Sequence, residues 1–135
     1  MHQSVRLWRY IGHVSFEHRL FQVLINYALR EKGYKTKIEH DLGEGRRLDL
    51  YATKDGHSVG IEIMLTANND YTNLLPISNS IDRLIIVCRD RQTVFDTEAW
   101  LGRVAKEEVR RKFSVVMFNQ FMRDVKRNII PEFLE

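Results

Sequence analysis

The sequence contains one cysteine and two prolines among its 135 residues. Cys88 closes the apolar run LIIVC, so we expect a buried thiol, no internal disulfide and a reducing, cytoplasmic environment. Pro76 and Pro131 stand alone, and no repeat, low-complexity tract or Pro/Gly/Ser-rich linker divides the chain. We therefore predict a single domain over residues 1–135.

Long hydrophobic runs are also absent. No stretch of about 18 apolar residues could span a bilayer, and residues 1–20 lack the apolar block of a signal peptide. We therefore expect no membrane partner. The balance of 21 basic and 18 acidic residues gives a net charge of +3, which permits nucleic-acid binding without requiring it. Residues 1–13 show no clear period and could be an arm, an extra strand or the trimmed end of a longer protein with further domains.

What is present is a regular alternation of helical and extended patterns. Residues 15–33 predict a helix, with Ser15 as N-cap and Gly33 as stop, because apolar side chains recur at helical spacing. That apolar arc consists of Phe16, Leu20, Val23, Leu24, Tyr27 and Ala28. Alternating residues then predict strands over 34–40, 46–52 and 58–65, the last two joined by a tight Asp55-Gly56 turn.

The second half continues the pattern. Residues 68–82 have a weak helical pattern, 83–88 read as a strand buried on both sides, and 96–113 as a helix capped by Asp96 or Thr97. Residues 114–118 predict a last strand and 119–130 a closing helix. The order α-β-β-β-α-β-α-β, with a final α, predicts an α/β fold in which helices flank a central mixed sheet.

Two acids sit inside the predicted hairpin. If Lys54 pairs with His57 across the turn, Asp49 lies directly opposite Glu62 on the same face. Opposed like charges destabilise a sheet unless a cation lies between them. Mg²⁺ or Mn²⁺ suits such a pair, because hard cations take one or two carboxylates and keep several waters. A solvated acidic pair on an exposed face is the alternative.

Glu17 is a third candidate acid. At about 100° per residue it falls between Leu24 and Ala28, inside the apolar arc of the first helix. A carboxylate pressed towards a core needs a partner. The alternative explanation is that Glu17 only benefits from the positive end of its own helix.

These residues resemble the PD-(D/E)xK nuclease superfamily, whose restriction-endonuclease-like fold has an αβββαβ core. The resemblance covers residues 15–88 and rests on Glu17 in the first helix, Asp49 in RRLDLY and Glu62 in GIEIML. It implies that Asp49, Glu62 and the carbonyl of Ile63 hold Mg²⁺ or Mn²⁺, and that Glu17 orients a water or a second ion. It further implies phosphodiester hydrolysis in DNA, in restriction, repair or mobile-element metabolism.

The sequence departs from the family at Met64, where the E-x-K motif has a lysine. Under the hairpin register Arg47 faces Met64, but arginine is a poor proton acceptor. If His40 pairs with Arg46 across the preceding loop, Lys37 lies opposite Asp49. We therefore hypothesise that Lys37 replaces the motif lysine. An exposed strand lysine balancing nearby acids is the alternative.

Other functions remain open. Met64 favours a degenerate nuclease fold that binds DNA or a partner protein without cleavage, with phosphate contacts from Arg89, Arg91 and the basic segments near residues 111–113 and 123–128. Cutting both DNA strands needs two sites, so a homodimer is also expected. A zinc site built from His13, His18, His40 and His57 lacks cysteine partners and regular ligand spacing.

Overall fold

The computed structural model describes residues 16–66, 71 and 74–128. In these residues the elements are, in order, α2 (Phe16–Glu31), β1 (Lys35–Gly43), β2 (Arg46–Lys54), β3 (His57–Met64), α3 (Leu74–Ser78), β4 (Arg83–Cys88), α4 (Arg91–Val104), α5 (Glu107–Arg110), β5 (Phe113–Met117) and α6 (Phe118–Lys126). The expected N-cap Ser15, residues 1–13 and His13 lie outside the described residues. Among the described helices, none is long and apolar enough to cross a membrane.

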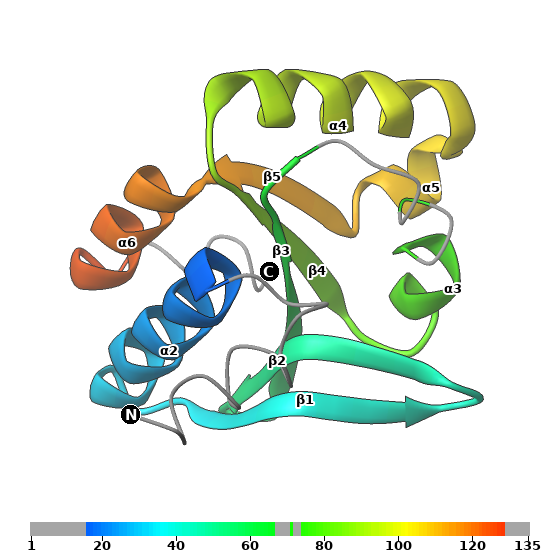
Figure 1. Ribbon diagram of the computed structural model, residues 1–135. Helices are drawn as coiled ribbons and strands as arrows, with labels where there is room; N and C mark the ends of the chain where they lie inside the picture. Colours follow the sequence, from blue (N-terminus) through cyan, green and yellow to red (C-terminus); the bar gives the residue numbers. More distant parts are fainter. Residues whose placement is uncertain (1–15, 67–70, 72–73, 129–135) are drawn as a thin grey trace, which may run out of the picture.

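The strands form one mixed sheet in the order β1-β2-β3-β4-β5 (Figure 1). β1, β2 and β3 are antiparallel neighbours, because short turns join them. β3, β4 and β5 run parallel, because helices carry the chain back between them. The predicted α/β class, with a mixed sheet flanked by helices, is confirmed.

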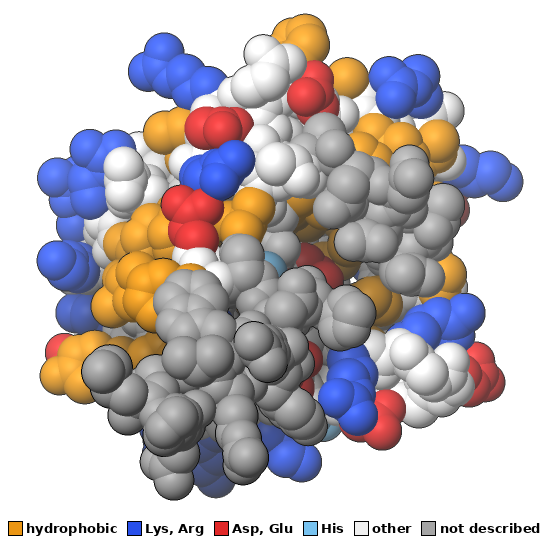
Figure 2. Space-filling model, in the orientation of Figure 1, with side chains coloured by type: hydrophobic (Ala, Val, Ile, Leu, Met, Phe, Trp, Pro, Cys, Tyr) orange, Lys and Arg blue, Asp and Glu red, His pale blue; other side chains and the backbone are white. Residues whose placement is uncertain are grey.

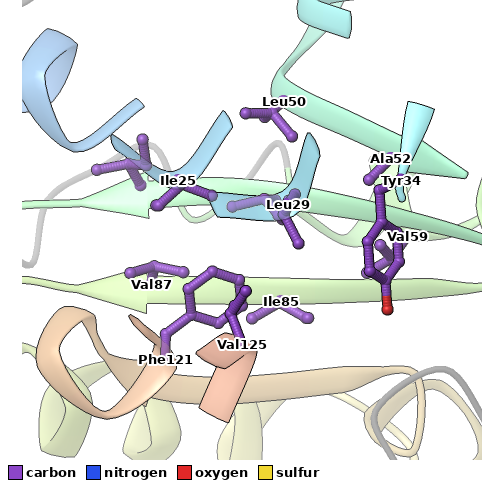
Figure 3. Close-up of a cluster of buried hydrophobic side chains, with 12 residues drawn as sticks. Ile25, Leu29, Tyr34, Leu50, Ala52, Val59, Ile85, Val87, Phe121 and Val125 are labelled. Atoms are coloured by element: carbon purple, nitrogen blue, oxygen red, sulfur yellow. The ribbon is translucent and has the colours of Figure 1, made fainter. Parts of the chain in front are cut away.

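Helices cover both faces of the sheet. α2 and α6 lie side by side on one face, and α3, α4 and α5 lie on the other (Figure 1). The cluster under α2 and α6 is drawn in Figure 3, where side chains from both helices point onto the strands. Its members are Ile25, Leu29, Tyr34, Leu50, Ala52, Val59, Ile61, Ile63, Ile85, Val87, Phe121 and Val125.

The second cluster fills the opposite face under α3 and α4. It consists of Leu48, Met64, Leu74, Ile77, Ile81, Leu84, Ile86, Cys88, Leu101 and Phe113. β4 contributes to both clusters, since Ile85 faces one and Ile86 the other. The prediction of a strand buried on both sides is therefore confirmed.

Two helix predictions need correction. α4 begins at Arg91, five residues before the predicted start, because Asp90 caps it: the Asp90 carboxylate accepts hydrogen bonds from the backbone N–H and the hydroxyl of Thr93. Those bonds lower the pKa of Asp90. The predicted helix also ends early, at Val104, and a separate single turn follows as α5.

The face that α2 buries is not the predicted apolar arc. Gln22, Ile25 and Leu29 face the sheet and are each 0 % exposed. The predicted arc points largely outward, with Phe16 53 % and Tyr27 64 % exposed. The helix itself is confirmed, and Gly33 ends it in a left-handed conformation at φ +89° that few other residues adopt without strain.

Candidate functional site

The hairpin of β2 and β3 has the predicted register. Lys54 pairs with His57, and the ladder continues as far as Leu50 opposite Ile61. Regular backbone pairing ends with that pair. The same register, continued by one step, places Asp49 opposite Glu62, as predicted. The Asp55-Gly56 turn sets this register, because both residues adopt positive φ as a two-residue hairpin turn requires.

Beyond Leu50, side chains replace the missing backbone bonds. The backbone N–H of Asp49 donates to Oε1 of Glu62 at 2.9 Å, and the N–H of Ile63 donates to Oδ2 of Asp49 at 2.7 Å. Each acid therefore satisfies an amide of the opposite strand. The two carboxylates are held close together, at the carboxyl end of β3.

The first turns of α2 lie over this pair and add two polar side chains. Nε2 of His18 is 3.2 Å from Oδ2 of Asp49, and both side chains are largely buried, at 15 % and 17 % exposure. Nε2 of Gln22 donates to the Asp49 carbonyl at 2.6 Å and to Oε1 of Glu39 at 2.9 Å. His18 and Gln22 thus hold the side chain and the backbone of Asp49 at once.

Sequence reasoning missed Gln22 and weighed His18 only as a zinc ligand. A signal was available: His18, Gln22, Ile25 and Leu29 follow one another at steps of four, three and four, which is one helical face. Gln22 is the polar member of that face nearest the middle of the helix. A fully buried amide has to be hydrogen-bonded, so it marks a polar contact inside the core.

β1 bends where it passes the site. Glu39 has φ +54°, and the pairing of β1 with β2 omits the Glu39–Asp49 step between Ile38–Leu50 and His40–Leu48. A left-handed conformation is costly for a residue with a Cβ. Gln22 stabilises it by binding the Glu39 side chain.

Glu17 does not point towards the core as predicted. Its side chain is 41 % exposed, and its carboxylate accepts a hydrogen bond from Nη1 of Arg89 at 2.7 Å. The correction follows from the helix orientation, because the arc that contains Glu17 is the outward one. Arg89 directly follows β4, so this ion pair lies at the end of the sheet where the parallel strands have their carboxyl ends. The Glu17 carboxylate raises the pKa of Arg89.

Lys37 is not opposite Asp49. It pairs with Tyr51, and His40 pairs with Leu48 rather than with Arg46. The predicted register was wrong by two residues, because the turn of β1 and β2 is irregular: Gly43, Glu44 and Gly45 all have positive φ, and a register shift occurs between Asp41 and Gly43. The geometric argument for Lys37 as the replacement lysine therefore fails.

Met64 occupies a core position. It is 6 % exposed, belongs to the cluster under α3 and α4, and its sulfur accepts a weak hydrogen bond from Oγ1 of Thr97 at 3.5 Å. Arg47 lies before the ladder of β2 and β3 begins and pairs with Asp41 of β1. Its expected position opposite Met64 is not part of the observed pairing.

The residues present fit a hard divalent cation with few protein ligands. Asp49 and Glu62 each offer two carboxylate oxygens, and the C=O of Ile63 points towards β2, as its N–H does. Within residues 16–66, 71 and 74–128 there is no group of three or more His, Cys, Asp or Glu side chains that could hold a metal. This donor set suits Mg²⁺ or Mn²⁺, which keep several waters. It suits a closed zinc site poorly.

A cavity of about 560 Å³ lies at the other end of the hairpin. Its lining includes Lys35, Lys54, His57 and Ser58 around the Asp55-Gly56 turn. The carboxylate pair does not border it.

Comparisons with known proteins support the fold. No family model and no curated protein match the chain. The crystal structure of AF1548, a protein of unknown function, matches with a TM-score of 0.51 and 15% identity over 74% of this chain and 59% of that one. YaeQ from Xanthomonas axonopodis pv. citri matches with a TM-score of 0.47 and 16% identity over 81% of this chain and 62% of that one. The chain therefore spans about three fifths of either structure, and the likeness to AF1548 concerns the fold alone.

Proposed function

We propose that this protein is a divalent-metal-dependent phosphodiesterase that acts on DNA, with a site similar to that of the PD-(D/E)xK nucleases. The observation that carries the proposal is the reciprocal bonding of Asp49 and Glu62, in which each carboxylate accepts the amide of the opposite strand. That bonding keeps two like charges together near the carboxyl end of β3, the end of the parallel strands at which open α/β sheets bind their ligands. The proposed ion offsets their repulsion.

Asp49, Glu62 and the carbonyl of Ile63 would hold Mg²⁺ or Mn²⁺. The bound ion supplies a more acidic water and stabilises charge on the phosphate. The chain itself contributes orientation: His18 fixes the Asp49 carboxylate and Gln22 fixes the Asp49 backbone. Both acids are therefore positioned before any ligand arrives, which reduces the cost of binding one.

Arg89 is the better candidate than Lys37 for contact with the phosphate. It follows the carboxyl end of β4, next to the first turn of α2. Glu17 in that turn orients its guanidinium through the 2.7 Å hydrogen bond. A guanidinium binds phosphate oxygens in a bidentate manner but does not release its proton. In this proposal Arg89 therefore stabilises negative charge and does not activate water.

Plasmid nicking with Mn²⁺ tests the proposal. Asp49→Ala and Glu62→Ala should each abolish nicking, because either change removes half of the carboxylate pair. Glu108→Ala is the matched control, since Glu108 is an exposed acid on α5. Arg89→Ala should weaken nicking, whereas Arg103→Ala, an exposed arginine in the last turn of α4, should not.

Titration calorimetry with Mn²⁺ gives a readout independent of cleavage. The wild-type protein should bind Mn²⁺ and the Asp49→Ala protein should not. The enzyme proposal is wrong if the wild-type protein binds no Mn²⁺ and cuts no duplex, single-stranded or branched DNA with Mg²⁺ or Mn²⁺.

Met64 favours a second candidate, a nuclease-like module that binds DNA or a partner protein without cutting. Its side chain is packed in the core, at the place where the family carries a catalytic lysine. Exposed Arg110, Arg111, Lys126 and Arg127 could then contact phosphates. Binding of labelled DNA without metal should weaken steeply with salt and show no sequence preference. A salt-insensitive complex, or none, would exclude this candidate.

The cytoplasm is the compartment that suits either candidate. Cys88 is 0 % exposed, and burial raises the pKa of its thiol to about 11. Such a thiol is protonated at neutral pH and reacts slowly. The folded protein should therefore resist thiol reagents until it is denatured.

A further inference from the structure

The cavity at the turn end of the β2–β3 hairpin combines positive charge, hydroxyl groups and an aromatic ring. Lysine and arginine side chains are spread over the face of the molecule seen in Figure 2, so charge alone does not mark a site. The volume of about 560 Å³ lies in the range of small-ligand pockets. The lining residues are Gly33, Lys35, Tyr51, Thr53, Lys54, Asp55, Gly56, His57 and Ser58.

Three neighbouring strands contribute side chains to the cavity. Thr53 of β2 pairs with Lys35 of β1 on one side and with Ser58 of β3 on the other. Directly paired residues point to the same face of a sheet, so an ammonium group and two hydroxyl groups form a row across the strands. Tyr51 lies two residues before Thr53 and shares this face. It is the face opposite α2, because Ala52, between them, belongs to the cluster under α2 and α6.

The ring of Tyr51 is held in one orientation. It stacks on the ring of His40, with the ring centroids 4.5 Å apart and 13° between the planes. His40 pairs with Leu48, three residues farther from the Asp55-Gly56 turn than Tyr51. His40 therefore covers the side of the ring that faces away from the turn, and the other side borders the cavity. A fixed aromatic surface is suited to stacking with a planar ligand group.

The charged groups of the lining differ in their existing contacts. Lys54 donates to the Lys32 carbonyl and lies 5.0 Å from the centre of the Tyr34 ring, so it already serves the fold. Lys35 is exposed, and within the described part of the chain its ammonium group has no hydrogen-bond or ion-pair partner. The lining holds these two lysines against one acid, Asp55. The balance favours an anionic ligand.

We propose that this cavity binds a nucleotide, with its base stacked on Tyr51 and its phosphate bound by Lys35 and the hydroxyl of Thr53. A nucleotide unites a flat aromatic base with a phosphate, and stacking platforms beside cationic groups bind that combination. An ammonium group and a hydroxyl both donate hydrogen bonds to phosphate oxygens. The inference does not depend on the chemistry of Asp49 and Glu62, which lie at the other end of the hairpin.

Titration calorimetry with AMP and its parts tests the site without altering the protein. EDTA in the buffer removes divalent ions, so the carboxylate pair repels the ligand. AMP should bind about fivefold or more tightly than adenosine, which lacks the phosphate, and than ribose 5-phosphate, which lacks the base. Equal affinities for AMP and either part, or no binding of AMP, would overturn the proposal.

Substitutions test the assigned roles. Tyr51→Leu should weaken AMP binding about tenfold through the loss of stacking but leave the affinity for ribose 5-phosphate unchanged, which also verifies that the variant is folded. Tyr51→Phe keeps the ring and should bind AMP like the wild type. Lys35→Ala should weaken both ligands about fivefold. The matched controls are Tyr27→Leu and Lys126→Ala, exposed on α2 and α6, which should change neither affinity. Wild-type AMP binding by the Tyr51→Leu protein would contradict the site.

A labelled single-stranded oligonucleotide distinguishes a free nucleotide from a nucleotide within a strand. If a strand occupies the cavity, AMP should displace the oligonucleotide in EDTA, and Tyr51→Leu should weaken its binding. If the oligonucleotide responds to neither change while AMP binds, the ligand is a free nucleotide. Either result supports the nucleotide site, whereas an effect of Tyr27→Leu equal to that of Tyr51→Leu would overturn it.

Discussion

The two ends of the β2–β3 hairpin are held together in different ways. At the turn end, Asp55 and Gly56 reverse the chain and backbone pairs with backbone from Lys54–His57 onward. At the other end, Asp49 and Glu62 accept the amides that the ladder leaves unpaired, and α2 adds Gln22. The turn end thus needs suitable φ angles, whereas the carboxylate end needs particular side chains. At the carboxylate end, side-chain hydrogen bonds take the place of the ladder, so the identity of Asp49 and Glu62 determines the geometry there.

Removal of Gln22 should have the largest effect on stability. Gln22→Ala leaves the partly buried Asp49 carbonyl and Glu39 carboxylate without the buried donor that they share. We expect a loss of about 2–3 kcal/mol in the free energy of unfolding. Urea denaturation measures it.

Gln92→Ala is the control for that prediction. Gln92 also bonds a carboxylate, that of Asp96, but on the exposed side of α4. Its removal should cost less than about 0.5 kcal/mol. Equal losses in the two variants would show that the carboxylate end does not depend on its buried amide.

The Asp55-Gly56 turn explains why part of the site was predictable from sequence. A two-residue turn fixes the register of every pair that follows, so Asp49 could be placed opposite Glu62 without coordinates. The loop before β2 has no such rule, because three consecutive residues adopt positive φ and the register shifts. Lys37 was misplaced for that reason.

The α2 face was mispredicted for another reason. Hydrophobic periodicity identifies a helix and an apolar side, but α2 has two apolar sides. The more apolar one, which contains Phe16 and Tyr27, faces outward, and the side with Gln22 faces the sheet. The prediction assigned Glu17 to the buried side of α2 and therefore did not identify its partner, Arg89. Distinguishing these sides requires knowledge of the neighbouring elements, which one sequence does not contain.

At the turn end, the backbone should matter most. Gly56 has φ +81°, so Gly56→Ala should cost about 1 kcal/mol through the left-handed conformation alone. Gly102→Ala is the control: Gly102 is inside α4 with open space around its Cα, and the change should stabilise the protein by about 0.5 kcal/mol. Thermal unfolding of both variants compares them. Two shifts of the same sign would contradict the prediction.

Lys54 is a side chain that contributes at the turn end. Its Nζ donates to the Lys32 carbonyl at 2.8 Å and lies 5.0 Å from the centre of the Tyr34 ring. Lys54→Met keeps the apolar stem and removes the charge, so we expect a loss of about 0.5–1 kcal/mol. Chemical denaturation at low and at high salt gives the value. A loss as large as that of Gln22→Ala would remove the contrast between the two ends.

The smallest effect on stability is expected from Glu62→Gln. The glutamine oxygen can still accept the Asp49 amide, and the change removes one of two neighbouring negative charges, so the free energy of unfolding should move by less than about 0.5 kcal/mol. Binding of Mn²⁺ in calorimetry should nevertheless disappear, whereas Glu108→Gln should leave it intact. A loss of more than 1 kcal/mol with unchanged Mn²⁺ binding would make Glu62 a structural residue. A folded protein that no longer binds the ion would instead mean that the negative charge of Glu62 serves the ligand and not the fold.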